Sequence, residues 1–323
     1  MSGAQAWEFT DDRGEELRAD HVPRRVVAYV RAGAALYDLG VTPVAVYGSG
    51  HDGDTPDPAK AGILEAVGVP YLGPGRGLDE EGLGALRPDL VVDVTYDGKD
   101  PYALDGGLAA RIGVPLAVLS VGGGSGLRDI LGRFDALAAG LTFLGPNAGH
   151  GEAGGREAAG PHAAHPEGAG PETVGPETGY PVTASPATGL GRGAALAEFA
   201  SAEAALREAV VRTGLGVLAL SGAGPDEVHL ARPRAWPELA WLSGIGVRMI
   251  DPGPGPGANW LTTDWERAAG LRPDLVLFDN RGHATPPYGL PSGVRLVPWN
   301  PETPPSPAAY ARFLRDLAEV LAP

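Results

Sequence analysis

The sequence predicts an α/β protein built from two doubly wound α/β lobes with a ligand cleft between them, and three observations support this fold class. One unit of sequence occurs twice, as LRPDLVVD at residues 86–93 and as LRPDLVLFD at residues 271–279. Each copy leads from a polar corner into a continuous apolar run, as in a strand that is buried on both faces of a parallel sheet. Other short apolar runs alternate with helical or turn segments, which is the rhythm of βαβ units. Two copies of one unit indicate two similar lobes whose equivalent loops face each other.

The first lobe is predicted to span residues 1–126. Residues 7–10 alternate between apolar and polar side chains and precede a hairpin-type turn at residues 11–14, which predicts a short strand. Helical or turn segments separate the runs that follow. We expect four or five short parallel strands from residues 25–29, 44–47, 70–72, the first repeat unit and residues 115–120.

A glycine-rich stretch, VGGGSG at residues 121–126, lies between a predicted strand and a predicted helix at residues 127–144. This context suits a phosphate-binding loop. The stretch lacks the Lys-Ser/Thr pair of a P-loop, and Leu127 stands where the dinucleotide fingerprint has its third glycine. We therefore interpret it as a turn into the helix.

Residues 145–191 differ in composition from the rest of the chain. They are rich in Gly, Pro, Ala, Glu and His and nearly free of large apolar side chains. Such a segment cannot bury enough apolar area to offset the entropy lost on ordering, so we predict a disordered insertion. Its histidines, His150, His162 and His165, could suggest a metal tract. No predicted helix or strand fixes them, so solvated histidines are the favoured interpretation.

A long helix is predicted at residues 192–213, with apolar side chains at three- and four-residue steps. The second lobe is predicted to span residues 214–323. Its apolar runs predict strands at residues 215–220, 247–250 and 294–299 and in the second repeat unit, followed by a closing helix at residues 307–321.

Composition excludes several functional classes. The net charge of −15 argues against nucleic acid as a partner, because a phosphate backbone would be repelled. The count of zero cysteines excludes disulfides, thiolate metal sites and lipid attachment at a cysteine. No apolar run approaches the length of a membrane span, so we expect no direct membrane insertion. The start, MSGAQAWEFTDD, has neither a basic segment nor an apolar stretch, so we expect no secretion signal in this chain.

Several motifs in their order and spacing resemble the iron-siderophore, haem and cobalamin class of ABC-transporter substrate-binding proteins, which have the class III periplasmic binding protein fold. The motifs span nearly the whole chain: FTDDRG at residues 9–14, PRRVVA at 23–28, LGVTPV at 39–44, LRPDLV at 86–91, and WE at 265–266 followed by LRPDLV at 271–276. The resemblance implies two α/β lobes joined by one long rigid helix, for which residues 192–213 are the candidate. The insertion and the missing export signal depart from the family pattern.

The resemblance also implies a function. Such a protein captures a small ligand, here a ferric siderophore or related iron chelate, and delivers it to an ABC permease with its ATPase. The expected protein is a monomer and not an enzyme, with no cofactor and no metal of its own, since iron enters only within the chelate. The resemblance implies an extracytoplasmic location; a cytoplasmic one is the alternative.

Two glutamates are candidates for docking to the permease. Glu81 lies seven residues before Pro88, and Glu266 lies seven residues before Pro273. In the family, carboxylates on opposite lobes meet permease arginines, and charge-assisted contacts suit reversible docking. Both acids also suit the first turn of a helix, where the helix dipole favours negative charge.

The ligand site is expected at the loops that follow the strands. Because a ferric siderophore has oxygen donors and often a net negative charge, arginines and flat aromatic rings are the expected lining. Arg76 resembles the arginine with which the family often grips an anionic ligand. The other candidates are Tyr47, Tyr96, Trp260 and Arg281, and then Arg31, His51, His229, Arg232 and Trp236. His51, His229 and His283 could bind haem or a metal directly, although single loop histidines are usually polar surface.

Two other classes of function stay open at this point. Asp93, Asp97 and Asp279 with His283 could form an acid–base or metal site, as in a metal-dependent α/β enzyme of similar two-lobe form. Ser221 is not in a nucleophile elbow, because glycine flanks it on one side only. The second alternative is a cytosolic accessory protein that binds a metabolite without a permease.

Overall fold

The computed structural model describes residues 6–122, 124–142 and 191–322. These residues belong to one compact unit. The predicted insertion at residues 145–191 lies outside the described residues except for Gly191.

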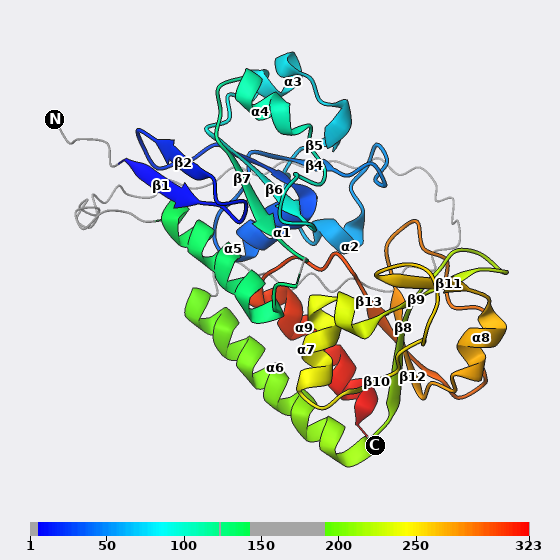
Figure 1. Cartoon of the computed structure of the whole chain (residues 1–323). Helices are drawn as coiled ribbons and strands as arrows, with labels where there is room; N and C mark the ends of the chain where they lie inside the picture. Colours follow the sequence, from blue (N-terminus) through cyan, green and yellow to red (C-terminus); the bar gives the residue numbers. More distant parts are fainter. Residues whose placement is uncertain (1–5, 123, 143–190, 323) are drawn as a thin grey trace, which may run out of the picture. The chain divides into compact units, whose positions relative to one another are not determined.

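The first lobe is built around a five-stranded sheet in the order β5-β4-β3-β6-β7, and every neighbouring pair is parallel (Figure 1). An antiparallel hairpin, β1-β2, precedes it. The parallel strands were expected from their apolar runs, and the side chains of β3 and β6 are all buried. The strands are β1 Trp7–Thr10, β2 Glu16–Ala19, β3 Val26–Tyr29, β4 Ala45–Gly48, β5 Tyr71–Pro74, β6 Leu90–Thr95 and β7 Leu116–Ser120.

The helices of the first lobe are short. Aspartates cap three of them at their first turns and accept backbone N–H bonds there. One of these helices ends at Ala61, where the chain continues as turns, and another begins only at Gly106. The elements are α1 Val30–Asp38, α2 Pro58–Ala61, the 3₁₀ turn η1 Gly75–Gly77, α3 Glu80–Ala85 and α4 Gly106–Arg111.

Two helices connect the lobes. In α5, Leu127–Thr142, some buried side chains belong to the core of the first lobe, while Leu127 and Leu131 belong to the core of the second. The long helix α6, Arg192–Thr213, buries one face along the C-terminal helix α9, Pro307–Leu321, as Figure 1 shows. Arg128 of α5 also pairs with Glu203 of α6.

The second lobe contains a six-stranded mixed sheet. Its path is β11-β9-β8-β12-β13, with β10 paired to β8. Alternate residues of β8 enter two different hydrophobic clusters, so the sheet is covered on both faces. The antiparallel pairing of β9 with β8 and β11 was not predicted. The strands are β8 Gly216–Gly222, β9 Val228–Ala231, β10 Arg248–Met249, β11 Trp260–Thr263, β12 Leu275–Asp279 and β13 Arg295–Trp299; between them lie η2 Pro233–Ala235, α7 Pro237–Gly244 and α8 Trp265–Gly270.

The sequence repeat is also a structural repeat. Asp79 caps α3 and Asp264 caps α8, each by accepting the N–H three residues on, at 2.7 and 2.8 Å. Two residues after each short helix ends lies an arginine with positive φ, 47° at Arg87 and 49° at Arg272. Among the described residues, these are the only positions other than glycine with positive φ. The following Pro-Asp corner then leads into β6 in one copy and β12 in the other.

In the described part of the chain, no helix combines the length and apolarity needed to cross a membrane.

Candidate functional site

A pocket of about 540 Å³ is lined by residues of both lobes. This volume lies within the range of small-molecule sites. The first lobe contributes loops that follow β4 and β6, and the second lobe contributes the ends of β8, β12 and β13 together with the β9–β11 pair. The lining residues are His51, Tyr96, Tyr102, Ser221, Gly222, Ala223, His229, Trp236, Asn259, Trp260, Thr262, Arg281, His283 and Glu302.

Aromatic rings form one wall of the pocket. The ring centroids of Trp236 and Trp260 lie 4.9 Å apart, and Trp299 packs behind them at 5.7 and 5.9 Å. On the first lobe, Tyr96 and Tyr102 meet edge to face at 4.9 Å. These geometries are favourable for aromatic pairs, so they hold the rings in place at the pocket surface.

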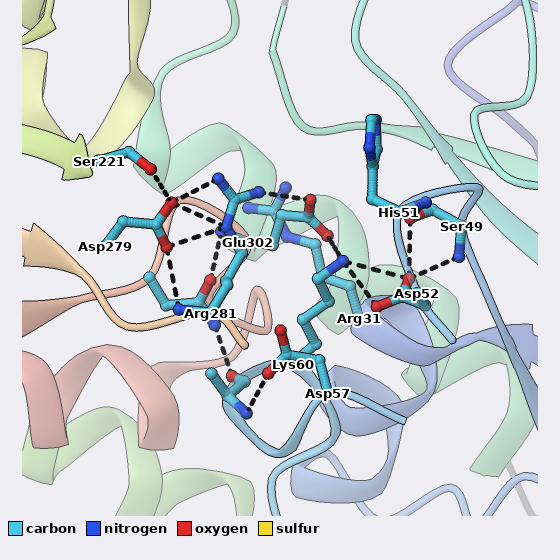
Figure 2. Close-up of polar contacts among 12 residues, drawn as sticks. Arg31, Ser49, His51, Asp52, Asp57, Lys60, Ser221, Asp279, Arg281 and Glu302 are labelled. Carbon is cyan, nitrogen blue, oxygen red and sulfur yellow. Dashed lines mark hydrogen bonds and ion pairs between the residues drawn. The ribbon is translucent and has the colours of Figure 1, made fainter. Parts of the chain in front are cut away.

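A buried ion-pair network lies beside the pocket and spans both lobes (Figure 2). The side chain of Lys60, at the end of α2, has 0% exposure. Its Nζ lies 3.0 Å from Asp52 Oδ1 in the same lobe and 3.1 Å from Glu302 Oε2 of the second lobe. A buried ammonium group requires such partners, because an unpaired charge would be costly away from water.

Arg281 continues this network in the second lobe, and Figure 2 shows it between two carboxylates. Its Nη2 lies 2.7 Å from Asp279 Oδ2, and its Nη1 lies 2.8 Å from Glu302 Oε1. Asp279 also accepts a hydrogen bond from Ser221 Oγ at 2.8 Å. The charge of Arg281 is therefore compensated within the protein.

Glu302 is the carboxylate on which the two lobes converge. It accepts a hydrogen bond from Tyr29 Oη of the first lobe in addition to its two ion pairs. Burial raises the pKa of this carboxyl, but Lys60 and Arg281 more than offset that effect, so the pKa lies below its ordinary value. Glu302 is consequently ionised at neutral pH.

Further contacts join the lobes around this network. Asp57 accepts a hydrogen bond from Gly282 N at 2.8 Å. The amide of Asn300 donates to the carbonyl of Ala59. Arg31 donates to the carbonyl of Thr303 at 3.1 Å and to Tyr96 Oη at 3.0 Å. The buried groups among them, Arg31 and Asn300, are therefore satisfied across the boundary between the lobes.

Three histidines reach the pocket. The rings of His51 and His283, from opposite lobes, have centroids 6.2 Å apart. Burial and the nearby Arg281 lower the pKa of His283, so its imidazole is neutral at neutral pH. His229 shares a hydrogen bond of 3.0 Å with Thr262. Within the described residues, no group of three or more His, Cys, Asp or Glu side chains could hold a metal ion.

Six of the ten predicted ligand-binding residues line this pocket: Tyr96, Trp260, Arg281, His51, His229 and Trp236. Arg31 lies behind the lining, where it is 3% exposed and holds the hydroxyl of Tyr96. The structure thus brings together residues from loops that are far apart in the sequence.

The other three do not line the pocket. Tyr47 is fully buried in the first lobe, and its hydroxyl donates to the carbonyl of Val92 at 3.1 Å. Arg232 instead donates to the carbonyls of a glycine-rich loop, at 2.8, 2.8 and 3.0 Å to Gly253, Gly255 and Gly257. Arg76 is exposed in η1 and is not part of the lining.

The two predicted docking residues occupy equivalent positions. Glu81 lies in the first turn of α3 and Glu266 in the first turn of α8, and both are exposed. Neither takes part in an ion pair with the described residues. The positions suit the helix dipole as well as a partner, and docking stays a prediction.

Several site residues were missed by the sequence analysis. Lys60 and Glu302 look like ordinary surface charges in the segments PDPAKAG and NPETPP. Asp52 and Tyr102 lie in polar loops without a distinguishing pattern. The segment SGAG, which ends β8 and begins the following loop, did carry a usable signal, since the end of a buried strand is a usual place for ligand contacts.

Comparison with solved structures places the fold. The ferric-siderophore receptor DesE from Streptomyces coelicolor is 24% identical, with a TM-score of 0.72 over 98% of this chain and 97% of that one. The periplasmic haem-binding protein RhuT from Roseiflexus sp. RS-1 is 19% identical, with a TM-score of 0.54 over 92% and 97%. A siderophore periplasmic binding protein from the fuscachelin gene cluster of Thermobifida fusca is 14% identical, with a TM-score of 0.55 over 93% and 96%.

No family model matches the sequence, and no curated protein matches it either. The structural likeness nevertheless covers nearly the whole chain and includes both lobes and the helices that connect them. The protein therefore has the two-lobe fold of class III substrate-binding proteins.

Proposed function

We propose that this protein is a solute-binding protein that captures a small ligand, a ferric siderophore or related iron chelate, and delivers it to an ABC permease. The observation that carries the proposal is the pocket of about 540 Å³ whose lining comes from both lobes. A site formed by two lobes can enclose a ligand on opposite sides and release it to a partner.

The nature of the lining supports binding over catalysis. Ser221 donates its hydroxyl proton to Asp279, whose carboxylate is already held by Arg281. The arrangement is therefore not that of a serine activated by a free base. The proposed role is that of a binding protein and not of an enzyme.

The class of ligand is supported by the structural neighbours. Two of those described above are named as siderophore proteins and one as a haem-binding protein. An iron chelate would present a rigid, partly apolar surface to Trp236, Trp260 and Tyr96. We further propose an extracytoplasmic location and docking to the permease through Glu81 and Glu266, one on each lobe.

Titration of the purified protein with a panel of ferric siderophores and haem tests the proposal. Binding is expected to quench tryptophan fluorescence, since Trp236 and Trp260 line the pocket. The variant Trp260→Phe should lose much of the change in signal and should bind more weakly by about 1 kcal/mol or more, because an aromatic contact is reduced.

Trp241→Phe is the matched control, because Trp241 packs on Phe199 at 5.9 Å and does not line this pocket. It should retain both the quenching and the affinity. If none of the ferric chelates binds in the micromolar range or tighter, the proposed function is wrong.

A further inference from the structure

The charges at the ligand pocket balance one another. Besides its histidines, the lining contains two ionisable groups that are charged at neutral pH, Arg281 and Glu302, and these are paired at 2.8 Å. Arg281 is also bound to Asp279. The lining therefore presents no uncompensated cation.

The groups behind the lining add no excess positive charge. Counted together with the lining, Arg31, Lys60 and Arg281 supply three positive charges, and Asp52, Asp279 and Glu302 supply three negative ones. Asp57, which accepts a hydrogen bond from Gly282 N, adds a further carboxylate. Among the described residues, the other arginines predicted for the ligand, Arg76 and Arg232, lie outside the lining. An anionic ligand entering the pocket would thus meet hydrogen-bond donors but no excess positive charge.

The charge of the whole chain acts in the same direction. The protein carries a formal net charge of −15. At low ionic strength such a charge slows the approach of anions and favours that of neutral or cationic molecules.

The pocket instead offers features that suit a neutral or cationic guest. The rings of Trp236, Trp260 and Tyr96 can pack against apolar surface, and an aromatic face can also attract a cation. The Arg281 guanidinium has five N–H groups. Nε and Nη2 each donate one hydrogen bond to Asp279, and Nη1 donates one to Glu302, so two N–H groups are left for ligand oxygens. Hydrogen bonds can therefore form to a chelate without a compensating charge on it.

From this charge balance we infer that the pocket selects ferric chelates whose net charge is zero or positive, and discriminates against anionic ones. The inference rests on the proposed function and specifies the ligand class for the same pocket. It reverses the expectation of an arginine-lined site for an anionic siderophore. A ferric tris-hydroxamate is a ligand of the selected kind, because three singly charged hydroxamates neutralise the ferric ion. A ferric tris-catecholate keeps excess negative charge and is of the rejected kind.

The test compares three probes by tryptophan quenching at about pH 7.5, where His283 is neutral. The probes are a neutral ferric tris-hydroxamate, one with an added ammonium group and a ferric tris-catecholate. The two hydroxamates should bind about tenfold or more tightly than the catecholate at low ionic strength. Added salt should slow association of the cationic probe and leave that of the neutral probe nearly unchanged.

A charge variant adds an independent readout. Glu302→Gln keeps the shape of the side chain and leaves Lys60 and Arg281 with excess positive charge. It should shift the ratio of catecholate to hydroxamate affinity by about tenfold toward the catecholate. Asp279→Asn likewise removes a negative charge that is paired with Arg281, but it keeps the ion pair of Glu302 with Lys60. This variant replaces Glu302→Gln in the test if Glu302→Gln does not fold.

The possible outcomes distinguish a failure of the inference about ligand charge from a failure of the proposed function. Equal or tighter binding of the catecholate to the unaltered protein overturns the inference and leaves the proposed function standing. Failure of all three probes to bind overturns the inference, and the proposed function also fails if no other chelate of the wider panel, haem included, binds. An unchanged affinity ratio in a folded Glu302→Gln or Asp279→Asn variant also overturns the inference.

Discussion

Glu238 is a buried carboxyl behind the pocket wall, and its protonation makes the stability of the protein depend on pH. Its side chain is 3% exposed, in the first turn of α7. Its Oε1 accepts a hydrogen bond of 3.2 Å from Trp299 Nε1, and Trp299 packs on the two pocket tryptophans. Burial is the main cause that raises the pKa of this carboxyl to about 7. The charged form is therefore disfavoured in the native protein.

The sign of the resulting pH dependence follows from linkage. Between about pH 4.5 and 7 the native protein retains a proton on Glu238 that the unfolded chain releases, so stability falls as pH rises through this window. The unaltered protein should therefore have a lower unfolding free energy at pH 8 than at pH 5. In Glu238→Gln, which mimics the neutral form, we expect this decrease to be smaller by on the order of 2 to 3 kcal/mol.

Urea unfolding followed by tryptophan fluorescence at the two pH values measures this effect. Glu65→Gln is the control, because Glu65 is exposed on the first lobe. A pH dependence of Glu238→Gln equal to that of the unaltered protein would show that Glu238 does not carry the effect.

For single residues, the sequence predicted which kinds of side chain line the site better than it predicted the residues with which they form ion pairs. Loop position was enough to propose Tyr96 and Arg281, because loops after strands gather at one edge of a sheet. Trp260 was also proposed from a loop, but it begins strand β11. Loop position could not show that Arg281 is neutralised by Asp279 and Glu302, since Glu302 follows a different strand. Nor could it show that Lys60 is buried and paired with Glu302 of the other lobe, because the two residues are far apart in the sequence.

At the scale of elements, the repeat was the most informative feature of the sequence. Continuous apolar runs predicted β6 and β12, and the parallel sheet of the first lobe followed from the same pattern. The pair β9–β11 was missed because each strand has only four residues and includes polar side chains such as His229 and Thr262. The antiparallel partner, rather than a local pattern, determines these strands.

The repeat contains a strained backbone position in each copy. Arg87 and Arg272 have φ values of 47° and 49°, a region that costs a residue with a Cβ atom about 1 kcal/mol or more relative to glycine. Both side chains are exposed. We expect Arg87→Gly and Arg272→Gly each to raise the unfolding free energy by about 0.5 to 1 kcal/mol, the lower end reflecting the entropy that glycine adds to the unfolded chain.

Urea midpoints of the two glycine variants and of Arg87→Ala would measure this gain. The alanine variant removes the same side chain but keeps the Cβ atom, so it should be no more stable than the unaltered protein. A gain of the same size in Arg87→Ala would assign the effect to the arginine side chain and not to the backbone.

At the scale of the molecule, the contacts that join the lobes are polar and specific. Lys60 with Glu302, Asp57 with Gly282 and Asn300 with Ala59 each connect one lobe to the other. The buried ion pair of Lys60 with Glu302 fixes relative orientation more than it adds stability, because desolvation offsets much of the attraction. The pocket is bounded by the same loops, so its form depends on these contacts.

The two exposed glutamates of the repeat lie on different lobes. A partner that contacts both would therefore recognise the orientation of one lobe relative to the other. Glu81 and Glu266 are each two residues after the capping aspartate of a short helix. If permease arginines meet them, the double variant Glu81→Gln with Glu266→Gln should reduce uptake of a labelled ferric chelate on the order of tenfold or more in cells that depend on this protein. Affinity for the chelate itself should not change, because neither residue lines the pocket.

The control is Glu65→Gln with Glu319→Gln, which removes one exposed carboxylate from each lobe and the same total charge. If both double variants reduce uptake equally, the effect is one of net charge and not of docking. If neither reduces it, these glutamates do not form the docking surface. Each single variant should have a smaller effect than the double, since one lobe would retain its contact and the remaining charge would still steer the encounter.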